Sequence, residues 1–355
     1  MKKSQIFKDK KILITGGTGS WGNELVRQLI YNHNPKEIRI FSRGEHKQVE
    51  MRHKYFHAKN LRFIIGDVRD LLAVELAMSG VDMVFNLAAL KHVPVCEENA
   101  WEAIQTNVYG VHNVIVAAMK HEIDVVVQVS TDKAVDPLNL YGFTKGCAEK
   151  LITSANYSPN KPMGTKFVCV RGGNVLSTTG SVVPLFKYLI QKYNKVTITD
   201  KNMSRYFMRV SHAIGLVLKA TTDPIGGEIY VMKMHGVKIT DLAETMIGKL
   251  GNNKTKIEYV GIRPGEKLYE VLVSKNESRR TIEDGEFYVI LPDELSHKKL
   301  NKKYKNNVSM NLEEYTSRNT HQLDKKTILK LLNEDGWLDQ EQNQPFSSVF
   351  SPYRD

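Results

Sequence analysis

The segment VSTDKAVDPLNLYGFTK, residues 129–145, concentrates side chains that can move protons. Tyr141 lies four residues before Lys145, and an Asp132–Lys133 pair begins nine residues upstream of the tyrosine. A phenol has a pKa near ~10 and needs a neighbouring cation to ionise near neutrality; a lysine one helical turn later, on the same face, provides one. One Tyr–Lys pair is enough to move a hydride, so the second pair predicts a further chemical step.

Each pair also has an ordinary structural interpretation. A tyrosine and a lysine at i, i+4 are common on helix surfaces, and Asp132–Lys133 could be an exposed ion pair in a turn. The location of the segment favours chemistry, because it follows the apolar run DVVVQVS (124–130), and ligands bind at the carboxyl ends of parallel strands. Thr131, at the end of this run, can hydrogen-bond a substrate hydroxyl.

A glycine pattern, GxxGxxG, lies near the N-terminus in ITGGTGSWGNELV. It follows the apolar run KILIT (11–15) and leads into a helical pattern at 23–33. Glycine permits a tight turn and the close approach of a pyrophosphate, and the helix N-terminus supplies N–H donors. The pattern therefore predicts a dinucleotide site. The residues of this turn expected at the cofactor are Gly16, Thr18, Gly19, Ser20, Trp21 and Gly22.

The end of the second predicted strand bears on the choice between NAD and NADP. NAD enzymes place an acidic residue there, whereas NADP enzymes tend to place an arginine. The run IFSRGEHK puts Ser42 and Arg43 at this position, which favours NADP, while Glu45 leaves NAD open. The other residues expected at the cofactor are Asp67, Val68, Leu87, Ala88 and Ala89, together with Tyr141 and Lys145.

The elements that must position these residues alternate between apolar runs and helical patterns. Strands are predicted at 11–15, 37–42, 61–67, 81–88, 124–130 and 166–174. Helices are predicted between them, for example at 23–33 and 100–121. Near-continuous apolar strands that alternate with helices predict an α/β fold with a Rossmann-type, doubly wound parallel sheet covered on both faces.

The pattern loosens after about residue 174 and predicts a smaller C-terminal substrate-binding lobe. We expect the Rossmann domain to span 1–174, with a returning segment at about 200–255 that includes a strand near 229–233. The lobe is expected at 175–200 and 256–340, and residues 341–355 are expected to form a tail. Helical patterns occur at 180–193, 238–251 and 324–336, and another is expected to follow the Pro–Gly turn within 262–272.

Composition limits the class of protein. The 355 residues are 41% hydrophobic and 25% charged, as in ordinary soluble proteins. The net charge of +11 favours anionic partners, but the positive residues are dispersed, so we expect an anionic metabolite and no nucleic acid. Cys96, Cys147 and Cys169 lack CxxC spacing, which argues against a disulfide framework or a metal site and fits the cytoplasm. No stretch approaches ~18 uninterrupted apolar residues, so no membrane insertion is expected.

Six ordered motifs resemble the extended short-chain dehydrogenase/reductase superfamily, namely TGGTGSWG, GDVRD, NLAALKHVP, TNVYG, VSTDKA and YGFTK. Three segments, STDKAVDPLNLYGFTK, GNVLSTTGSVVPLF and GIRPGEKLYEVL, are similar to the inverting UDP-N-acetylglucosamine 4,6-dehydratases of pseudaminic acid, capsule and O-antigen pathways. The resemblance covers roughly residues 8–290. Retaining hexose dehydratases have Asp–Glu where this chain has Asp132–Lys133, which points to the inverting class. Gly172 and Thr179 depart from the family's usual aromatic residue and arginine.

The resemblance implies a reaction in three stages: oxidation at C4, loss of water across C5 and C6, and return of the hydride to C6. Tyr141 is expected to take the O4 proton, with Thr131 hydrogen-bonded nearby. Asp132 is expected to protonate O6, and Lys133, as a neutral amine, to take the C5 proton.

A UDP-sugar carries a diphosphate, so fixed cations are expected in the substrate lobe. Arg205 and Arg263 are the candidate phosphate ligands, and Asn174 could hydrogen-bond the diphosphate. Glu266 could accept from ribose hydroxyls, and Lys91 could reach the sugar. The resemblance also implies a homo-oligomer, with a hexamer among the candidate states.

Other functions remain consistent with these residues. A UDP-sugar 4-epimerase or a retaining 4,6-dehydratase would use Tyr141 and Lys145, but neither needs Lys133. A sensor module that holds NADP without turnover could lose the Tyr–Lys pair, which this chain retains.

Overall fold

The computed structural model describes residues 5–175, 181–222, 224–292 and 302–338. The chain forms two compact units. Among the described residues, the first comprises those within 1–173, 210–233 and 271–315, and the second comprises those within 174–209, 234–270 and 316–355. Thr179 and the expected tail at 341–355 lie outside the described residues.

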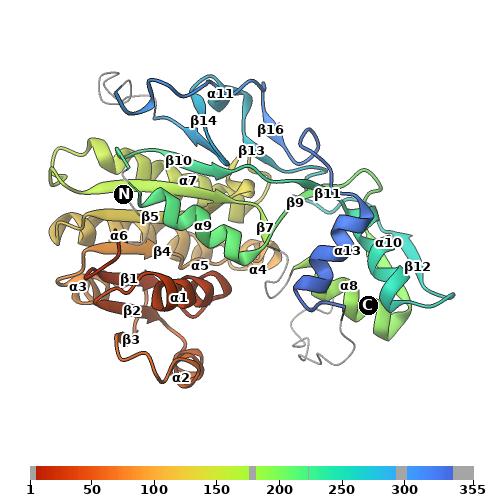
Figure 1. Ribbon diagram of the computed structural model, residues 1–355, viewed down its shortest axis with the longest axis horizontal. Coiled ribbons are helices and arrows are strands. Elements are labelled where there is room, and N and C mark those ends of the chain that lie inside the picture. The colour runs from red at the N-terminus through yellow and green to blue at the C-terminus, as the bar shows by residue number, and fades with distance from the viewer. Residues whose placement is uncertain (1–4, 176–180, 223, 293–301, 339–355) are drawn as a thin grey trace. The chain divides into compact units, whose positions relative to one another are not determined.

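A nine-stranded sheet forms the centre of the first unit (Figure 1). Its strands are β1 (Lys11–Thr15), β2 (Glu37–Ser42), β3 (Leu61–Ile65), β4 (Met83–Asn86), β5 (Val125–Thr131), β6 (Lys166–Gly172), β10 (Ile229–Met232), β14 (Thr281–Asp284) and β15 (Phe287–Ile290). The order is β14-β15-β10-β6-β5-β4-β1-β2-β3. All pairs from β10 to β3 are parallel, whereas β15 pairs antiparallel with β10 and β14. The strand order reverses at β1, and ligands bind beyond the carboxyl ends of strands at such a reversal.

Helices flank this sheet (Figure 1). They are α1 (Ser20–Asn32), α2 (Glu45–Lys54), α3 (Leu71–Met78), α4 (Val93–Glu98), α5 (Ala100–Ile104), α6 (Gly110–Lys120), α7 (Leu140–Ser154), α9 (Val210–Ala220) and α11 (Lys275–Ser278). A π-helical turn, η1 (Gln105–Tyr109), joins α5 to α6, and 3₁₀ turns form η2 (Asp132–Ala134) and η3 (Ala155–Tyr157). Helices α1 and α9 contact each other, and α6 contacts both α3 and α7.

The central strands β1 and β4 are buried on both faces, as near-continuous hydrophobic runs require. Ile12, Ile14 and Phe85 are fully buried in the core of the first unit. Leu25 and Leu29 on α1 pack into the same cluster, because their spacing of four residues puts them on one face of the helix. The predicted Rossmann-type α/β fold is confirmed.

The second unit has its own apolar core, which includes Phe186, Ile190, Leu242 and Met246. Its elements are β7 (Asn174–Val175), α8 (Val182–Tyr193), β8 (Lys195–Ile198), β9 (Ser204–Met208), β11 (Gly236–Lys238), α10 (Ile239–Leu250), β12 (Lys256–Tyr259) and α13 (Lys325–Glu334). Strand β9 lies between β7 and β11, and β12 pairs with β8. Helix α10 contacts both α8 and α13.

The unit boundaries differ from those expected. The strand near 229–233 does return to the main sheet, as β10, but residues 234–255 belong to the second unit. Residues 271–315, expected in the substrate lobe, belong to the first unit. The physical reason is strand pairing: β15 bonds antiparallel to β10 and carries β14 with it, so this hairpin extends the main sheet.

The prediction of a helix after the Pro–Gly turn is wrong. The segment 262–272 forms a turn and then enters β13 (Val271–Val273). Gly261 and Gly265 have φ angles of 85° and 75°, which interrupt helical geometry. The short strand β16 (Tyr315–Thr316) contains the point in the sequence where the chain passes from the first unit to the second. No helix among the described residues is long and apolar enough to cross a membrane.

Candidate active site

The glycine turn has the geometry that a dinucleotide requires. Gly16 has a φ of 63°, and a Cβ there would lie 2.8 Å from the backbone nitrogen of Ala88. A Cβ on Gly22 would lie 2.2 Å from the backbone oxygen of Gly17, so helix α1 can approach β1 this closely only with glycine. Gly19 is the N-cap of α1 and no side chain caps it, which leaves backbone N–H groups for an anion. These residues fit the pyrophosphate of a dinucleotide.

The other residues of the turn and its wall have local roles. Trp21 packs against the core of the first unit, and Ser20 is exposed. The backbone oxygen of Thr18 accepts a hydrogen bond from the Asn23 side chain at 3.0 Å. The wall formed by Leu87, Ala88 and Ala89 begins where β4 ends, and the backbone nitrogen of Ala88 donates to the Thr15 hydroxyl at 3.3 Å.

Arg43 lies at the carboxyl end of β2, with 53% of its side chain exposed. One of its nitrogens is 3.7 Å from Asp67, which Arg69 approaches at 2.7 Å. Burial alone would raise the pKa of Asp67, but the hydrogen bonds and charge of Arg69 and the charge of Arg43 lower it. Because Arg69 takes the closer ion pair, Arg43 retains an accessible guanidinium. Sequence reasoning missed Arg69, although it lies in the motif GDVRD.

Ser42 and Val68, which are also expected at the cofactor, each contact a neighbouring element. The Ser42 hydroxyl accepts from the Gln48 side chain at 3.0 Å. Val68 is buried beside α6, where a Cβ on Gly110 would lie 2.7 Å from its side chain.

The acid–base segment follows β5 directly. The Thr131 hydroxyl donates to Oδ1 of Asp132 at 2.9 Å, and Nζ of Lys133 donates to the same oxygen at 3.0 Å. The Asp132 side chain is 1% exposed and the Lys133 side chain 24%. The pair is therefore a half-buried, hydrogen-bonded ion pair and not an exposed pair in a turn.

Helix α7 packs tightly against this segment. Asn139 caps the helix by accepting from the backbone nitrogen of Gly142 at 2.9 Å. A Cβ on Gly142 would lie 2.3 Å from the backbone oxygen of Lys133, so glycine permits the close approach. This packing brings Tyr141, near the start of α7, beside Thr131 and Lys133, which both act on its phenol.

Burial dominates the titration of the Tyr–Lys pair. It raises the pKa of Tyr141 to about 12, although the Lys133 charge and the Thr131 hydrogen bond act in the lowering direction. Burial also lowers the pKa of Lys145 to about 8, and Nζ of Lys145 donates to the backbone oxygen of Val129 at 2.6 Å. The structure thus adds Lys133 as a cation that acts on the Tyr141 phenol, while the charge expected from Lys145 stays a prediction.

Asn107 is a buried polar residue that sequence reasoning missed. It lies in the π-helical turn η1 and is 1% exposed. Its side chain bonds both backbone groups of Leu90 at 2.9 Å and donates to the Thr144 hydroxyl of α7 at 3.0 Å. It thus ties the loop after β4 to the helix that carries Tyr141. The signal was an amide in the motif TNVYG within an apolar helical pattern, and π-turns are frequent at functional sites.

Lys91 follows Leu90 in that loop. It is exposed, but the surrounding protein desolvates its ammonium and lowers its pKa. Its place in the first unit, beyond the carboxyl end of β4, is where sheet ligands bind.

The remaining substrate candidates lie in the second unit. Arg205 on β9 is 9% exposed, with Nε 3.4 Å from Glu270 and Nη2 3.7 Å from Glu266. The backbone nitrogen of Arg263 donates to Glu266 at 3.2 Å. Asn174 lies on β7, the neighbour of β9. The structure thus groups Arg205, Arg263 and Glu266, and it adds Glu270, which sequence reasoning missed.

Residues 12–292 match the family described as polysaccharide biosynthesis protein. The chain belongs to this family. It is 43% identical over 289 residues to a UDP-N-acetylglucosamine 4,6-dehydratase (inverting) of Campylobacter jejuni, covering 81% of this chain and 84% of that protein. It is 41% identical over 333 residues to a UDP-glucose 4-epimerase of Rickettsia canadensis, covering 92% and 96%.

Solved structures agree with the fold. The X-ray structure of Pen from Bacillus thuringiensis superposes with a TM-score of 0.86 at 38% identity, covering 94% of this chain and 100% of that one. The resemblance to the extended short-chain dehydrogenase/reductase superfamily, and within it to the inverting dehydratases, is confirmed.

Proposed function

We propose that the protein is an NADP-dependent UDP-N-acetylglucosamine 4,6-dehydratase that inverts C5. The observation that carries this proposal is the half-buried, hydrogen-bonded Asp132–Lys133 pair beside the phenol of Tyr141. The site therefore has acid–base groups beyond those that hydride transfer alone requires. The name of the Campylobacter jejuni relative supports the same reaction.

The glycine turn and Arg43 would hold the cofactor. The backbone N–H groups at the start of α1 would bind the pyrophosphate, and the exposed guanidinium of Arg43 would bind the 2′-phosphate. When bound, the nicotinamide would supply the hydride acceptor for C4 of the sugar and the hydride donor for C6. NAD, which lacks the 2′-phosphate, would lose the Arg43 contact.

Tyr141 would remove the proton from O4 during the first stage. Its phenol lies among the groups that favour ionisation, which are the Lys133 charge and the Thr131 hydroxyl. Lys145 stands one turn further along α7 and is fixed on the Val129 carbonyl. Its position, four residues after Tyr141 on the same face of the helix, would let its ammonium favour ionisation of the phenol.

Asp132 and Lys133 would carry out the elimination. Lys133 must accept the C5 proton as an amine, and Asp132 must give a proton to O6 as an acid, so that the C6–O bond breaks and water leaves as the C5–C6 double bond forms. A single proton transfer across their 3.0 Å hydrogen bond produces this neutral pair. Burial of Asp132 disfavours separated charges and helps this transfer. Protonation of C5 from the opposite face then gives the inverted L-arabino sugar.

The second unit would bind the nucleotide part of the substrate. Arg205 and Arg263 are suited to the diphosphate, because a guanidinium offers a planar fork to phosphate oxygens. Asn174 would add a hydrogen bond to the diphosphate, Glu266 would accept from the ribose hydroxyls, and Lys91 of the first unit would contact the sugar.

Incubation with UDP-N-acetylglucosamine and NADP in heavy water, followed by NMR of the product, tests this function. We expect a 4-keto-6-deoxy sugar with a single deuterium at C5 and the L-arabino configuration. A product that keeps the D-xylo configuration from the outset supports a retaining dehydratase. A 4-epimer that retains its C6 hydroxyl would sink the dehydratase proposal.

A UDP-sugar 4-epimerase is the second candidate. The Rickettsia canadensis relative carries that name and matches 92% of this chain. An epimerase would use Tyr141 and Lys145 but needs no base at C5. Incubation with UDP-glucose, with the product identified by NMR, separates the two: epimerisation at C4 without loss of water favours this candidate. A third hypothesis, an NADP sensor without turnover, predicts no product from either sugar.

We further propose that the protein works in the cytoplasm as a homo-oligomer, with a hexamer as one candidate. Three free cysteines are compatible with a reducing compartment. Trp101, Tyr109 and Phe143, each more than half exposed, offer apolar surface for self-association. Light scattering after size exclusion at micromolar concentration tests this, and a monodisperse monomer would contradict it.

A further inference from the structure

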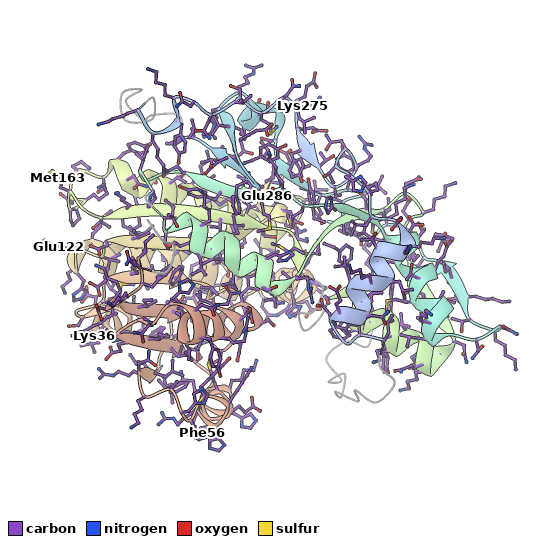
Figure 2. All side chains as sticks on the ribbon, in the orientation of Figure 1. Lys36, Phe56, Glu122, Met163, Lys275 and Glu286 are labelled. Atoms are coloured by element: carbon purple, nitrogen blue, oxygen red, sulfur yellow. The ribbon has the colours of Figure 1, made fainter. Side chains whose placement is uncertain are left out.

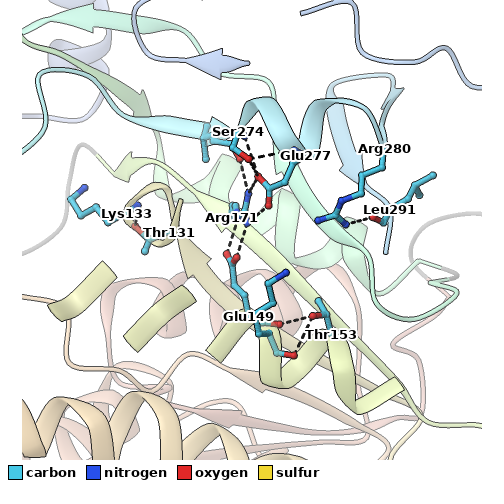
Figure 3. Close-up of polar contacts among 11 residues, drawn as sticks. Thr131, Lys133, Glu149, Thr153, Arg171, Ser274, Glu277, Arg280 and Leu291 are labelled. Carbon is cyan, nitrogen blue, oxygen red and sulfur yellow. Dashed lines mark hydrogen bonds and ion pairs between the residues drawn. The ribbon is translucent and has the colours of Figure 1, made fainter. Parts of the chain in front are cut away.

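Arg171, on β6, is a fully enclosed cation held between two carboxylates (Figure 3). Its guanidinium bonds Glu149 through Nε at 2.8 Å and Nη2 at 2.7 Å. It bonds Glu277 through Nη2 at 2.7 Å and Nη1 at 2.9 Å, and Nη1 also donates to the backbone oxygen of Leu272 at 3.0 Å. We call this set, Arg171 with Glu149 and Glu277, the Arg171 clamp.

The clamp needs an arginine for geometric reasons. All five N–H donors of the guanidinium are used, in two bidentate pairs and one bond to the backbone. A lysine at this position would keep the charge but has only three donors on one nitrogen, so it could not form both bidentate pairs and the backbone bond. Arg171→Lys therefore tests geometry separately from charge.

The two carboxylates belong to different elements, and each of these is connected to the acid–base segment. Glu149 is on α7, four residues after Lys145 and eight after Tyr141. Glu277 is the third residue of α11, where it forms a capping box with Ser274, accepting from its nitrogen at 3.1 Å and its hydroxyl at 3.0 Å. Strand β13 directly precedes Ser274 and contacts the turn η2, which contains Asp132 and Lys133.

The charges of the clamp extend to the active site. Its one cation and two anions leave a net negative charge in a buried region, and Lys145 is the buried cation on which Glu149 acts. Burial lowers the pKa of Lys145, while Cys169 on β6 and Glu149 on its own helix oppose that effect. The clamp thus lies close enough to Lys145 to influence its ammonium.

Stability alone gives a weak reason for such an arrangement. A buried ion pair roughly breaks even against a well-packed apolar replacement, because desolvation offsets the Coulomb attraction. What an ion cluster with bidentate geometry does provide is a fixed orientation of the elements that carry its members.

We propose that the Arg171 clamp positions the active site by fixing the position of α7 relative to β13. Helix α7 carries Tyr141 and Lys145, while β13 supports the turn that carries Asp132 and Lys133. The effect of the clamp on catalysis rests on the function proposed above, whereas its effect on the order of residues 129–145 does not. Arg171, Glu149 and Glu277 touch no reacting atom in this proposal, so they act as positioning residues.

The test compares Arg171→Lys, Glu277→Gln and the milder Ser274→Ala, which removes the hydroxyl bond to the Glu277 carboxylate and the N-cap bond from the Glu277 backbone nitrogen but leaves both carboxylates of the clamp in place. Lys275→Ala is the matched control, because Lys275 lies on α11 with its side chain 68% exposed and projects outward (Figure 2). Each purified variant, with NADP bound, is assayed for kcat and KM with UDP-N-acetylglucosamine. Hydrogen–deuterium exchange is then followed in peptides covering residues 129–145 and 271–278.

We expect kcat to fall by roughly 10- to 100-fold in Arg171→Lys and Glu277→Gln with KM unchanged, since small misplacements of reacting groups have effects of this size. Exchange should rise in both peptides and not across the sheet, with a smaller effect in Ser274→Ala and none in Lys275→Ala. Unchanged kcat and exchange in the folded variants would overturn the proposal, as would a uniform rise in exchange. If both larger substitutions fail to fold, Ser274→Ala decides by the same readouts.

Failure of the proposed function is distinguishable from failure of the clamp. If the wild type forms no product from UDP-N-acetylglucosamine, the proposed function is wrong, and the exchange measurement still tests whether the clamp orders the segment 129–145. If the wild type is active and Arg171→Lys leaves both kcat and exchange unaltered, the clamp proposal alone fails.

Discussion

Lys145 and Gln128 donate to the same backbone carbonyl, that of Val129, at 2.6 and 2.9 Å. Gln128 in turn accepts from the Asn86 side chain at 2.6 Å, and Asn86 is hydrogen-bonded to Thr15 at the end of β1. A chain of buried polar groups therefore crosses the sheet from the glycine turn to the lysine. Such fully paired networks hold their members in one arrangement, so the Lys145 ammonium has a fixed place.

Substituting Lys145→Met should abolish turnover and stabilise the fold at neutral pH. Burial lowers the pKa of Lys145 from 10.5 to about 8, which means that the folded state holds this charge at a cost. Removing it should raise the free energy of unfolding by up to about 3 kcal/mol, less the lost hydrogen bond to Val129. Urea unfolding at neutral pH, paired with the product assay, measures both effects.

The stabilising effect of Lys145→Met should shrink with rising pH. Between about pH 8 and 10.5 the unfolded wild type binds more protons at this position than the folded one, so wild-type stability rises with pH relative to the variant. Lys150→Met, an exposed residue of the same helix, is the control and should show neither effect. A gap between wild type and Lys145→Met that stays constant over this range contradicts the assignment.

Glu277 should make the fold sensitive to acid. Burial would raise its pKa, but the charge and hydrogen bonds of Arg171 outweigh burial and lower it from 4.5 to about 2. The unfolded state therefore binds more protons between these values, and the stability that Glu277 contributes is lost as pH falls from 4.5 towards 2.

The measurement for Glu277 is thermal unfolding of wild type and Glu277→Gln from neutral to acidic pH. The melting temperature of the variant should be lower at neutral pH, and the difference should narrow below pH 4.5. Glu313→Gln, which removes an exposed partner of Lys275, serves as the control and should track the wild type. An equal difference at all pH values would show that Glu277 does not titrate as described.

Much of the fold was predictable because each signal was local. The bounds of β1 and β2 match the predicted strands 11–15 and 37–42, and α8 and α10 fall within the predicted helical patterns, since apolar periodicity set them. The unit boundaries were not predictable, because the pairing of β15 with β10 joins residues distant in sequence. The pairing of the β14–β15 hairpin with the main sheet, and not the local propensity of its residues, decides which unit contains it.

The candidate site divides in the same way. Gly16 and Gly22 could be found from their spacing in the glycine motif. The motif predicts a close approach of backbone segments, and this approach requires glycine at both positions. The segment 131–145 could be found from its side chains. The Arg171 clamp could not be found from the sequence. Glu149, Arg171 and Glu277 are far apart in the chain, and only the fold brings both carboxylates to the guanidinium. Helical spacing predicts Lys145 as the cation that acts on Tyr141, and the turn η2 adds Lys133, which could not be foreseen from that spacing.

Arg43→Ala should weaken NADP binding without weakening NAD binding. The guanidinium is accessible because Arg69 holds the closer ion pair with Asp67. Losing a charge-assisted contact to a phosphate typically costs about 1.5–3 kcal/mol, which corresponds to roughly 10- to 150-fold in Kd. Fluorescence titration with both cofactors measures it, and Arg62→Ala, an exposed arginine on β3, is the control. Equal affinities of the wild type for NADP and NAD would argue against the NADP assignment.

Lys133→Ala separates the two chemical steps of the proposed reaction. Tyr141 and Lys145 remain, so oxidation at C4 should persist in part, while loss of the C5 base should slow dehydration by roughly 100- to 10,000-fold. Oxidation should be reduced as well, because the Lys133 charge favours ionisation of the Tyr141 phenol. Single-turnover absorbance of the reduced nicotinamide follows the first step, and NMR of the product follows the second. Lys36→Ala, on the surface of the first unit (Figure 2), should behave as wild type in both. If Lys133→Ala forms the 4-keto-6-deoxy sugar at a near wild-type rate, Lys133 is not the base at C5, and the 3.0 Å ion pair with Asp132 has only a structural role.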